Sequence, residues 1–240
     1  MIYHVLPGDS LVEEFNKTKI GGETIICREC MIVGDLSGET LDEFFDRRAN
    51  FLLVAYATDE IEYHEKVADE LSRLIDLDDG TEVNLWFEYE LFCQTNMWFC
   101  LYLLAGTGAT VYRVEPSVRG ADEIWKGFGG LTETELKACF AKRYQFTEEE
   151  LQLGVDLWAA YTAGDHDRLR ELGKTVSPCF PYLAEVVEAE IEKSTRPAEI
   201  LRDIKGSGIR EFDEIFRQFT ERAGIYGFGD AQVADLLDKG

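Results

Sequence analysis

Short apolar runs alternate with amphipathic stretches through the first half of the chain. The runs are rich in β-branched and aromatic residues and are bounded by Gly, Pro or Asp, which is typical of buried strands. We expect four strands, at residues 2–6, 24–27, 83–87 and 109–114. Between them, apolar residues recur at helical spacing, and this predicts helices at about residues 10–18, 40–55, 60–75 and 89–105. Strands that alternate with helices pair in parallel through right-handed crossovers.

The strand pattern stops after Glu115-Pro116, and helical patterns fill the rest of the chain. Several predicted helices begin with a capping box, in which a Ser or Thr side chain and a Glu three residues later satisfy free backbone donors. The four boxes are Ser10–Glu13, Thr40–Glu43, Thr132–Glu135 and Thr147–Glu150. The predicted fold class is therefore α/β: a small, mostly parallel four-stranded sheet with flanking helices in residues 1–118, followed by an all-helical domain in residues 119–240.

Composition and charge restrict the classes of partner. The 240 residues carry a formal net charge of −23, and this negative field disfavours nucleic-acid binding, including binding through a helix-turn-helix of the last helices. The longest apolar run, residues 97–105, is about half of the roughly 18 residues that cross a bilayer, so no membrane contact is expected. The first residues predict a strand rather than a signal peptide. Six dispersed cysteines suit a reducing compartment, and we expect a cytoplasmic protein.

Two short motifs permit functional interpretations, but the other sequence elements that each function requires are missing. Gly8-Asp9-Ser10-Leu11 matches the nucleophile block of the GDSL hydrolases, yet no Asp-x-x-His element accompanies it, and a helix cap explains Ser10. Cys27-Arg28-Glu29-Cys30 has the Cys-x-x-Cys spacing of redox and zinc sites. No helix start follows it and no second Cys-x-x-Cys exists, so buried thiols at a strand end are the favoured interpretation.

Position in the predicted sheet gives a stronger functional hypothesis. Ligands of open parallel sheets collect outside the carboxyl ends of the strands, where helix N-termini offer free N–H groups. The six polar residues expected at or near this edge are Asp9, Ser10, Arg28, Glu29, Glu88 and Gln94. We expect them to bind a small polar molecule such as a nucleotide or sugar phosphate, with or without a metal ion.

The expected roles follow from residue chemistry. Asp9, Glu29 and Glu88 could ligate a cation or accept hydrogen bonds, and Ser10 would orient the ligand. The opposite interpretation is that the acidic residues only favour a helix N-terminus and that Arg28 neutralises a neighbour. The sequence specifies no dedicated metal centre, cofactor, catalytic residue or oligomeric state.

Other features allow a noncatalytic interpretation. The helix predicted at residues 209–222 is amphipathic through Phe212, Phe216 and Phe219, so the C-terminal helices could form a protein–protein interaction or regulatory module. His4, inside the first strand, is interpreted as a hydrogen-bonded core or rim residue. The segment 226–230, with Gly227 and Gly229, could be a turn that docks on the first domain.

Four segments together resemble a known bacterial family. They are His4-Val5-Leu6-Pro7-Gly8-Asp9-Ser10, Ile26-Cys27-Arg28-Glu29-Cys30 followed by Gly34-Asp35-Leu36-Ser37-Gly38, Leu85-Trp86-Phe87-Glu88-Tyr89-Glu90-Leu91-Phe92-Cys93-Gln94, and Ile225-Tyr226-Gly227-Phe228-Gly229-Asp230. On these residues the chain is similar to the family catalogued as domain of unknown function eighteen thirty-five. The resemblance implies a cytosolic bacterial protein, and it supplies no catalytic residue.

Overall fold

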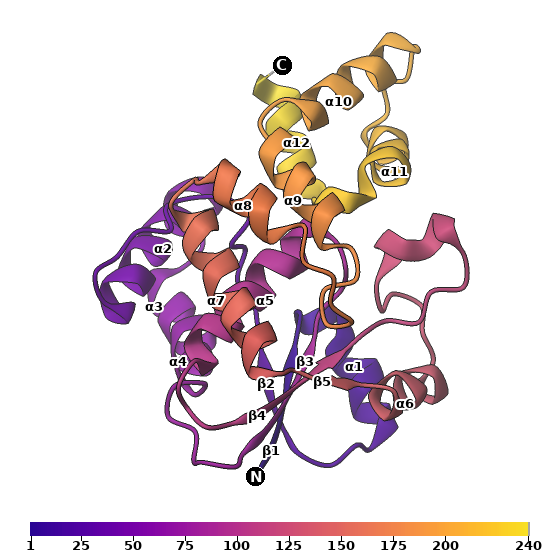
Figure 1. Cartoon of the computed structure of the whole chain (residues 1–240). Coiled ribbons are helices and arrows are strands. Elements are labelled where there is room, and N and C mark those ends of the chain that lie inside the picture. Colours follow the sequence, from indigo (N-terminus) through magenta and orange to yellow (C-terminus); the bar gives the residue numbers. More distant parts are fainter. Residues whose placement is uncertain (240) are drawn as a thin grey trace.

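A computed structural model describes residues 1–239 of the chain as a mixed α/β fold (Figure 1). Five strands form one sheet in the order β2-β1-β3-β4-β5. The first four run parallel, and the short β5 pairs antiparallel with β4 at the edge. The strand bounds are Ile2–Leu6 (β1), Glu23–Ile26 (β2), Glu82–Trp86 (β3), Thr110–Val114 (β4) and Tyr144–Gln145 (β5).

The described α-helices lie on both faces of the sheet and beyond its carboxyl edge. Their bounds are Asp9–Thr18 (α1), Leu41–Tyr56 (α2), Glu60–Tyr63 (α3), Asp69–Ser72 (α4), Leu91–Leu104 (α5), Glu133–Ala141 (α6), Glu148–Thr162 (α7), His166–Leu172 (α8), Leu183–Glu192 (α9), Arg196–Gly206 (α10), Phe212–Ala223 (α11) and Asp230–Lys239 (α12). A π-helical turn, His64–Ala68, joins α3 to α4. Short 3-10 helices occupy Ala121–Lys126 and Gly224–Tyr226.

Strand residues alternate between two apolar layers, because successive side chains point to opposite faces of a sheet. Val5 and Leu85 belong to the larger core, which includes side chains of α2, α4, α5 and α7. Leu6 and Trp86 belong to the smaller core on the other face, which α1 and α6 cover. Helices α10, α11 and α12 lie at the end of the molecule remote from the N-terminus (Figure 1).

The structure confirms the parallel sheet and corrects its size. The prediction of four strands is wrong, because β5 adds a fifth. Two exposed polar residues, Tyr144 and Gln145, form β5, so it carries no apolar strand signal. A separate helical domain after residue 118 is not confirmed, since β5 and α6 lie in the sheet region. Residues of α7 and α9, such as Leu157 and Val186, share the larger core with the strands.

Of the four predicted capping boxes, three mark helix starts correctly, two of them as complete boxes, and one is wrong. Thr132 and Thr147 each accept a hydrogen bond from the N3 backbone of α6 and α7, and the N3 glutamates reciprocate. In α2, the Thr40 side chain accepts from the Glu43 N–H, while the Glu43 carboxylate accepts from Glu39 instead. The box predicted at Ser10 is wrong, because α1 begins at Asp9 after Gly8 and has no side-chain cap.

Helix α5 passes through the middle of the larger core. It is apolar on nearly all sides, as expected of a helix buried all round. Its close neighbour α7 approaches at Gly154, where an added Cβ would lie 2.3 Å from Cδ1 and 2.9 Å from Cβ of Leu101. A glycine at this position therefore sets the spacing of the two helices.

The variant Gly154→Ala should destabilise the protein by about 1–3 kcal/mol, because the new methyl group overpacks the contact with Leu101. Gly206→Ala in α10 is the matched control, since an added Cβ there meets nothing within 4 Å. It should stabilise by about 0.4–1 kcal/mol through the unfolded state. Urea unfolding measures both. An equal response of the two variants would show that Gly154 has no spacing role.

His4 is a fully buried residue with both ring nitrogens hydrogen-bonded, which confirms the interpretation of a satisfied core histidine. Its Nδ1 accepts from Trp86 Nε1 at 3.2 Å, so its Nε2 carries the proton and donates to the Gly21 carbonyl, also at 3.2 Å. This arrangement requires the neutral ring. Burial accordingly lowers the pKa of His4, while the hydrogen bond to Gly21 and the charge of Glu82 oppose this effect and the charge of Arg143 adds to it.

Stability should therefore fall at acid pH because of His4. Below the unfolded-state pKa of about 6.5 the unfolded chain takes up a proton that the folded chain takes up only at lower pH. In urea unfolding at a series of pH values, His4→Phe should flatten the slope just below that point, whatever its effect on stability at neutral pH. An unchanged slope in His4→Phe would refute the assignment.

Candidate functional site

The parallel sheet brings the ends of β1 to β4 to a common edge. The chain moves from β1 to β2 on one side and then to β3 on the other, and such a reversal opens a crevice outside the strand ends. Asp9, Arg28 and Glu88 follow β1, β2 and β3, as predicted. The six predicted site residues nevertheless lie in three separate groups of contacts: Asp9, Ser10 and Arg28 in one, Glu29 in the second, and Glu88 with Gln94 in the third.

The first group is an exposed ion pair between β1 and β2. Arg28 holds the Asp9 carboxylate with two hydrogen bonds, of 2.8 and 2.9 Å, and also donates to the Lys66 carbonyl at 3.0 Å. This pairing lowers the pKa of Asp9. Ser10 lies beside it on the exposed first turn of α1. Asp9 and Arg28 thus neutralise each other at the surface.

The second group surrounds Glu29, which is buried and turned into the protein. Arg48 of α2 donates to both of its carboxylate oxygens, at 3.1 and 2.8 Å, and the Tyr63 hydroxyl donates to one of them. Arg48 also donates to the carbonyls of Cys30 and Val33, at 2.9 and 2.6 Å. The Glu29–Arg48 pair therefore fixes the loop after β2 and leaves Glu29 no free oxygen for a ligand.

Two amide side chains of α5 form hydrogen bonds with the backbone of the loops that follow β2 and β3. Asn96 donates to the Glu29 carbonyl at 2.7 Å and accepts from the Met31 N–H at 3.0 Å. Gln94 donates to the Glu88 carbonyl at 2.6 Å. The predicted site residue Gln94 is therefore near Glu88, but its amide nitrogen supports the backbone.

The third group contains Glu88, Glu90 and Cys93, at the turn from β3 into α5. Glu88 accepts a hydrogen bond from the Phe128 N–H at 2.6 Å, and Glu90 caps α5 by accepting from the Cys93 N–H at 3.1 Å. Burial raises the pKa of Glu88, and burial together with the Glu88 charge raises the pKa of Glu90 to about 8. A buried carboxylate beside a partly buried one is unusual without a compensating group.

Glycines from two distant loops close over these carboxylates. An added Cβ at Gly127 would lie 2.0 Å from the Glu88 carboxylate, and one at Gly227 would lie 2.4 Å from Glu90 Cγ. Both glycines have positive φ, of 63° and 65°. The turn at Gly227 thus docks on the loop after β3, so the C-terminal segment is part of the site.

Behind this group lies a buried cation, Arg113 of β4. Its Nη2 donates to the Glu88 carbonyl at 3.2 Å, while Nε and Nη1 have no hydrogen-bond partner among the described residues. Burial lowers the pKa of Arg113 and raises that of Glu115, two residues along the chain. Glu115 Oε1 is also buried without a partner in the described part of the protein.

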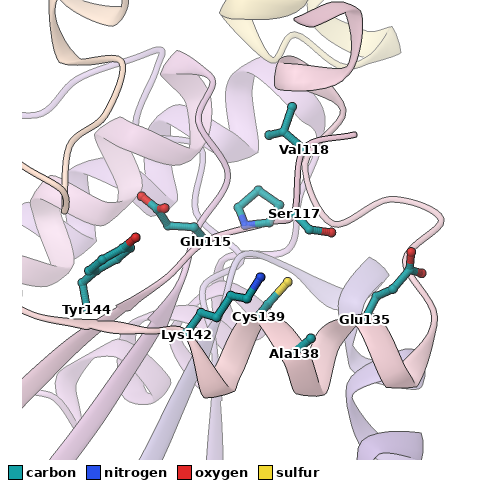
Figure 2. A pocket seen from close by; sticks show the side chains of 9 residues that line it. Glu115, Ser117, Val118, Glu135, Ala138, Cys139, Lys142 and Tyr144 are labelled. Carbon is teal, nitrogen blue, oxygen red and sulfur yellow. The ribbon is translucent and has the colours of Figure 1, made fainter. Parts of the chain in front are cut away.

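Glu115 lines a cavity of about 420 Å³ at the carboxyl end of β4 (Figure 2). The opposite wall comes from the end of α6 and from β5, with Lys142 extending toward β4 and Tyr144 beside it. Cys139, Ser117 and Glu135 complete its polar lining. The cavity therefore presents both charge signs, and it lies beside β4 rather than at the reversal between β1 and β3.

No family model matches the chain, and neither the curated proteins nor the solved structures include a significant match.

None of the described helices is long and apolar enough to span a membrane.

Sequence reasoning missed Glu90, Cys93, Arg113 and Glu115 as site residues. Arg113 carried a usable signal, because a charged residue inside an otherwise apolar strand needs a partner when it is buried. Glu90 and Cys93 carried a weaker sequence signal, since an acidic residue at a helix start and a cysteine in an apolar helix are ordinary features. Lys142 and Tyr144 carried no sequence signal, because only the fold places them opposite Glu115.

The buried and exposed ion pairs should differ sharply in their effect on stability. Arg48→Met leaves the Glu29 carboxylate buried without its cation and should cost about 3–5 kcal/mol in urea unfolding. Asp9→Asn removes the exposed pair with Arg28 and should cost less than about 1 kcal/mol. Similar losses in the two variants would contradict the structural role assigned to Glu29.

Proposed function

We propose that the protein binds a small polar molecule with a cationic nitrogen, such as an amine or an amino-acid-like zwitterion, in the cavity at the end of β4. The Glu115 carboxylate on the wall of this cavity carries the proposal: its Oε1 is buried with no hydrogen-bond partner within 3.5 Å among the described residues, and its neighbours are the Arg113 charge and the Tyr89 hydroxyl. A buried acceptor without a donor is costly, so a rotation of the carboxylate that brings this oxygen to a ligand donor is favourable, and a hydrogen bond to a charged group contributes about 1.5–3 kcal/mol.

The charges around the cavity favour the same ligand class. A cationic group would contact Glu115, and an anionic group of the same molecule would contact Lys142 on the other wall. The overall charge of −23 attracts cations and repels polyanions. The alternative ligand is a nucleotide or sugar phosphate. Its phosphate would be attracted by Lys142 but repelled by Glu115 and Glu135.

Other expectations remain part of this proposal. The free thiols of the six cysteines favour a cytoplasmic location. Membership of the bacterial family of unknown function rests on the sequence motifs alone. A protein–protein interaction module is supported less, because Phe219 is buried and Phe216 partly buried, which leaves Phe212 as the exposed member of that face.

Thermal-shift measurements with a panel of amines, amino acids, nucleotides and sugar phosphates test the proposal. An amine-bearing compound should raise Tm, since a ligand at about 100 times its Kd stabilises the native state by about 2.7 kcal/mol. Glu115→Gln should abolish the shift. Glu133→Gln is the matched control and should keep the shift, because Glu133 lies on the same helix, pairs with Lys137 at the surface and does not line the cavity.

Two outcomes would overturn the proposal. One is stabilisation by phosphate compounds alone. The other is an amine-dependent shift that persists in Glu115→Gln.

A further inference from the structure

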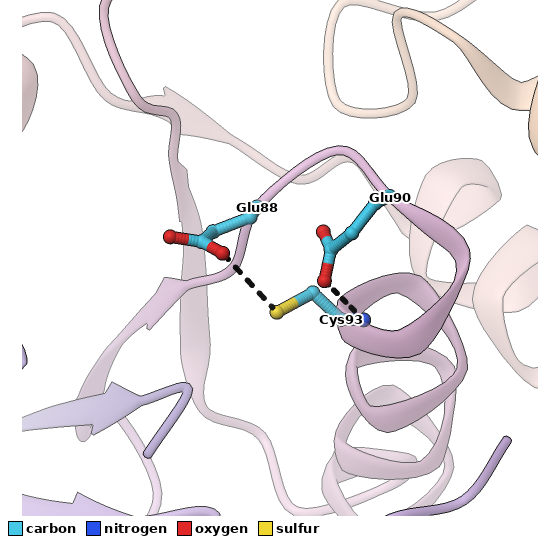
Figure 3. Close-up of side chains that lie close together, drawn as sticks. All are labelled: Glu88, Glu90 and Cys93. Atoms are coloured by element: carbon cyan, nitrogen blue, oxygen red, sulfur yellow. Dashed lines mark hydrogen bonds between the residues drawn. The ribbon is translucent and has the colours of Figure 1, made fainter. Parts of the chain in front are cut away.

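The turn from β3 into α5 places three potential metal ligands around one point. Glu88, Glu90 and Cys93 each offer one ligand atom, and these atoms lie within 4.8 Å of one another. Figure 3 shows the two carboxylates and the thiol turned toward a common space from the loop and the first turn of α5. The Cys93 sulfur lies 4.0 Å from Glu88 Oε2.

An independent observation points to a missing partner at this place. Glu90 is only 5% exposed, and its Oε2 has no hydrogen-bond partner among the described residues. Its other oxygen is occupied as the cap of α5. Arg113, the buried cation whose charge affects Glu88, donates to the Glu88 backbone rather than to a carboxylate. The protein itself therefore leaves Oε2 unsatisfied.

We propose that Glu88, Glu90 and Cys93 form a binding site for a divalent transition-metal ion of the zinc class. A thiolate ligand selects Zn²⁺ and similar ions over Mg²⁺ and Ca²⁺, which prefer oxygen ligands only. Three protein ligands leave a fourth tetrahedral position, as in zinc sites with a bound water. On binding, the Cys93 thiol releases its proton to solvent, and so does Glu90 where it is protonated.

The ligand geometry requires only a small adjustment. A tetrahedral ion with Zn–S of about 2.3 Å and Zn–O of about 2.0 Å holds its ligand atoms about 3.5 Å apart. The three ligand atoms now lie within 4.8 Å of one another, so a shift of about 1 Å brings them to this spacing. The Phe128 N–H already orients the Glu88 carboxylate, as outer hydrogen bonds do in metal sites.

This site is separate from the ligand cavity at Glu115, so either proposal can fail alone. Protein freed of metal with a chelator is titrated with Zn²⁺ by calorimetry and with Co²⁺ by absorption spectroscopy. One equivalent of Zn²⁺ should bind with proton release, and Co²⁺ should give a thiolate-to-cobalt charge-transfer band. Cys93→Ala should lose the band and weaken Zn²⁺ binding by more than the roughly 10–100-fold that loss of an outer partner costs.

Matched variants separate ligation from folding. Glu90→Gln keeps the amide oxygen that caps α5, so it should fold as the wild type does and still lose Zn²⁺ affinity. Cys179→Ala is the control, because Cys179 is another buried thiol beside a carboxylate, with its sulfur 3.7 Å from Glu150 Oε2. It should keep both the stoichiometry and the band.

Three results would overturn the site: no stoichiometric Zn²⁺ binding, binding that Cys93→Ala leaves unchanged, or a charge-transfer band that is lost in Cys179→Ala instead. Weak binding of several ions to the acidic surface, unaffected by Glu90→Gln, would count against it in the same way.

Discussion

The parallel pairing of β1, β2, β3 and β4 sends every strand end, with the polar residues that follow it, to one edge of the sheet. Helices cover both faces of the sheet, and they also partly bury the turns at this edge. Any carboxylate in these turns must then be paired, hydrogen-bonded or protonated. The candidate chemistry of the protein follows from how each turn meets this requirement.

In the turn after β2, the buried carboxylate of Glu29 is fully paired and hydrogen-bonded. Arg48 supplies Glu29 with two charge-assisted hydrogen bonds and then uses its remaining donors on the carbonyls of the same loop. The fork of an arginine suits this task because its donors are rigid and planar. This part of the edge is structural, although it lies where a ligand site was expected.

The turns after β3 and β4 meet the requirement only in part. Glu88, Glu90, Arg113 and Glu115 are largely buried, and several of their polar atoms lack partners in the described chain. Loops around Gly127 and Gly227 enclose two of these carboxylates, so solvent does not fully supply what is missing. Unsatisfied buried groups of this kind distinguish these turns from the structural turn after β2, and they are the reason that both proposals lie here.

The sequence by itself determined the parallel α/β class, the bounds of most strands and helices to within a few residues, the caps at Thr132 and Thr147, and the buried role of His4. These features depend on local propensity, periodicity and capping, which act over a few residues. Only the tertiary structure decided that Arg48 pairs with Glu29, that β5 joins the sheet, and that the turn at Gly227 covers Glu90. Each of these contacts joins residues distant in the chain, 19 positions apart for Arg48 and Glu29, and residue spacing carries no information about which buried charge reaches which partner.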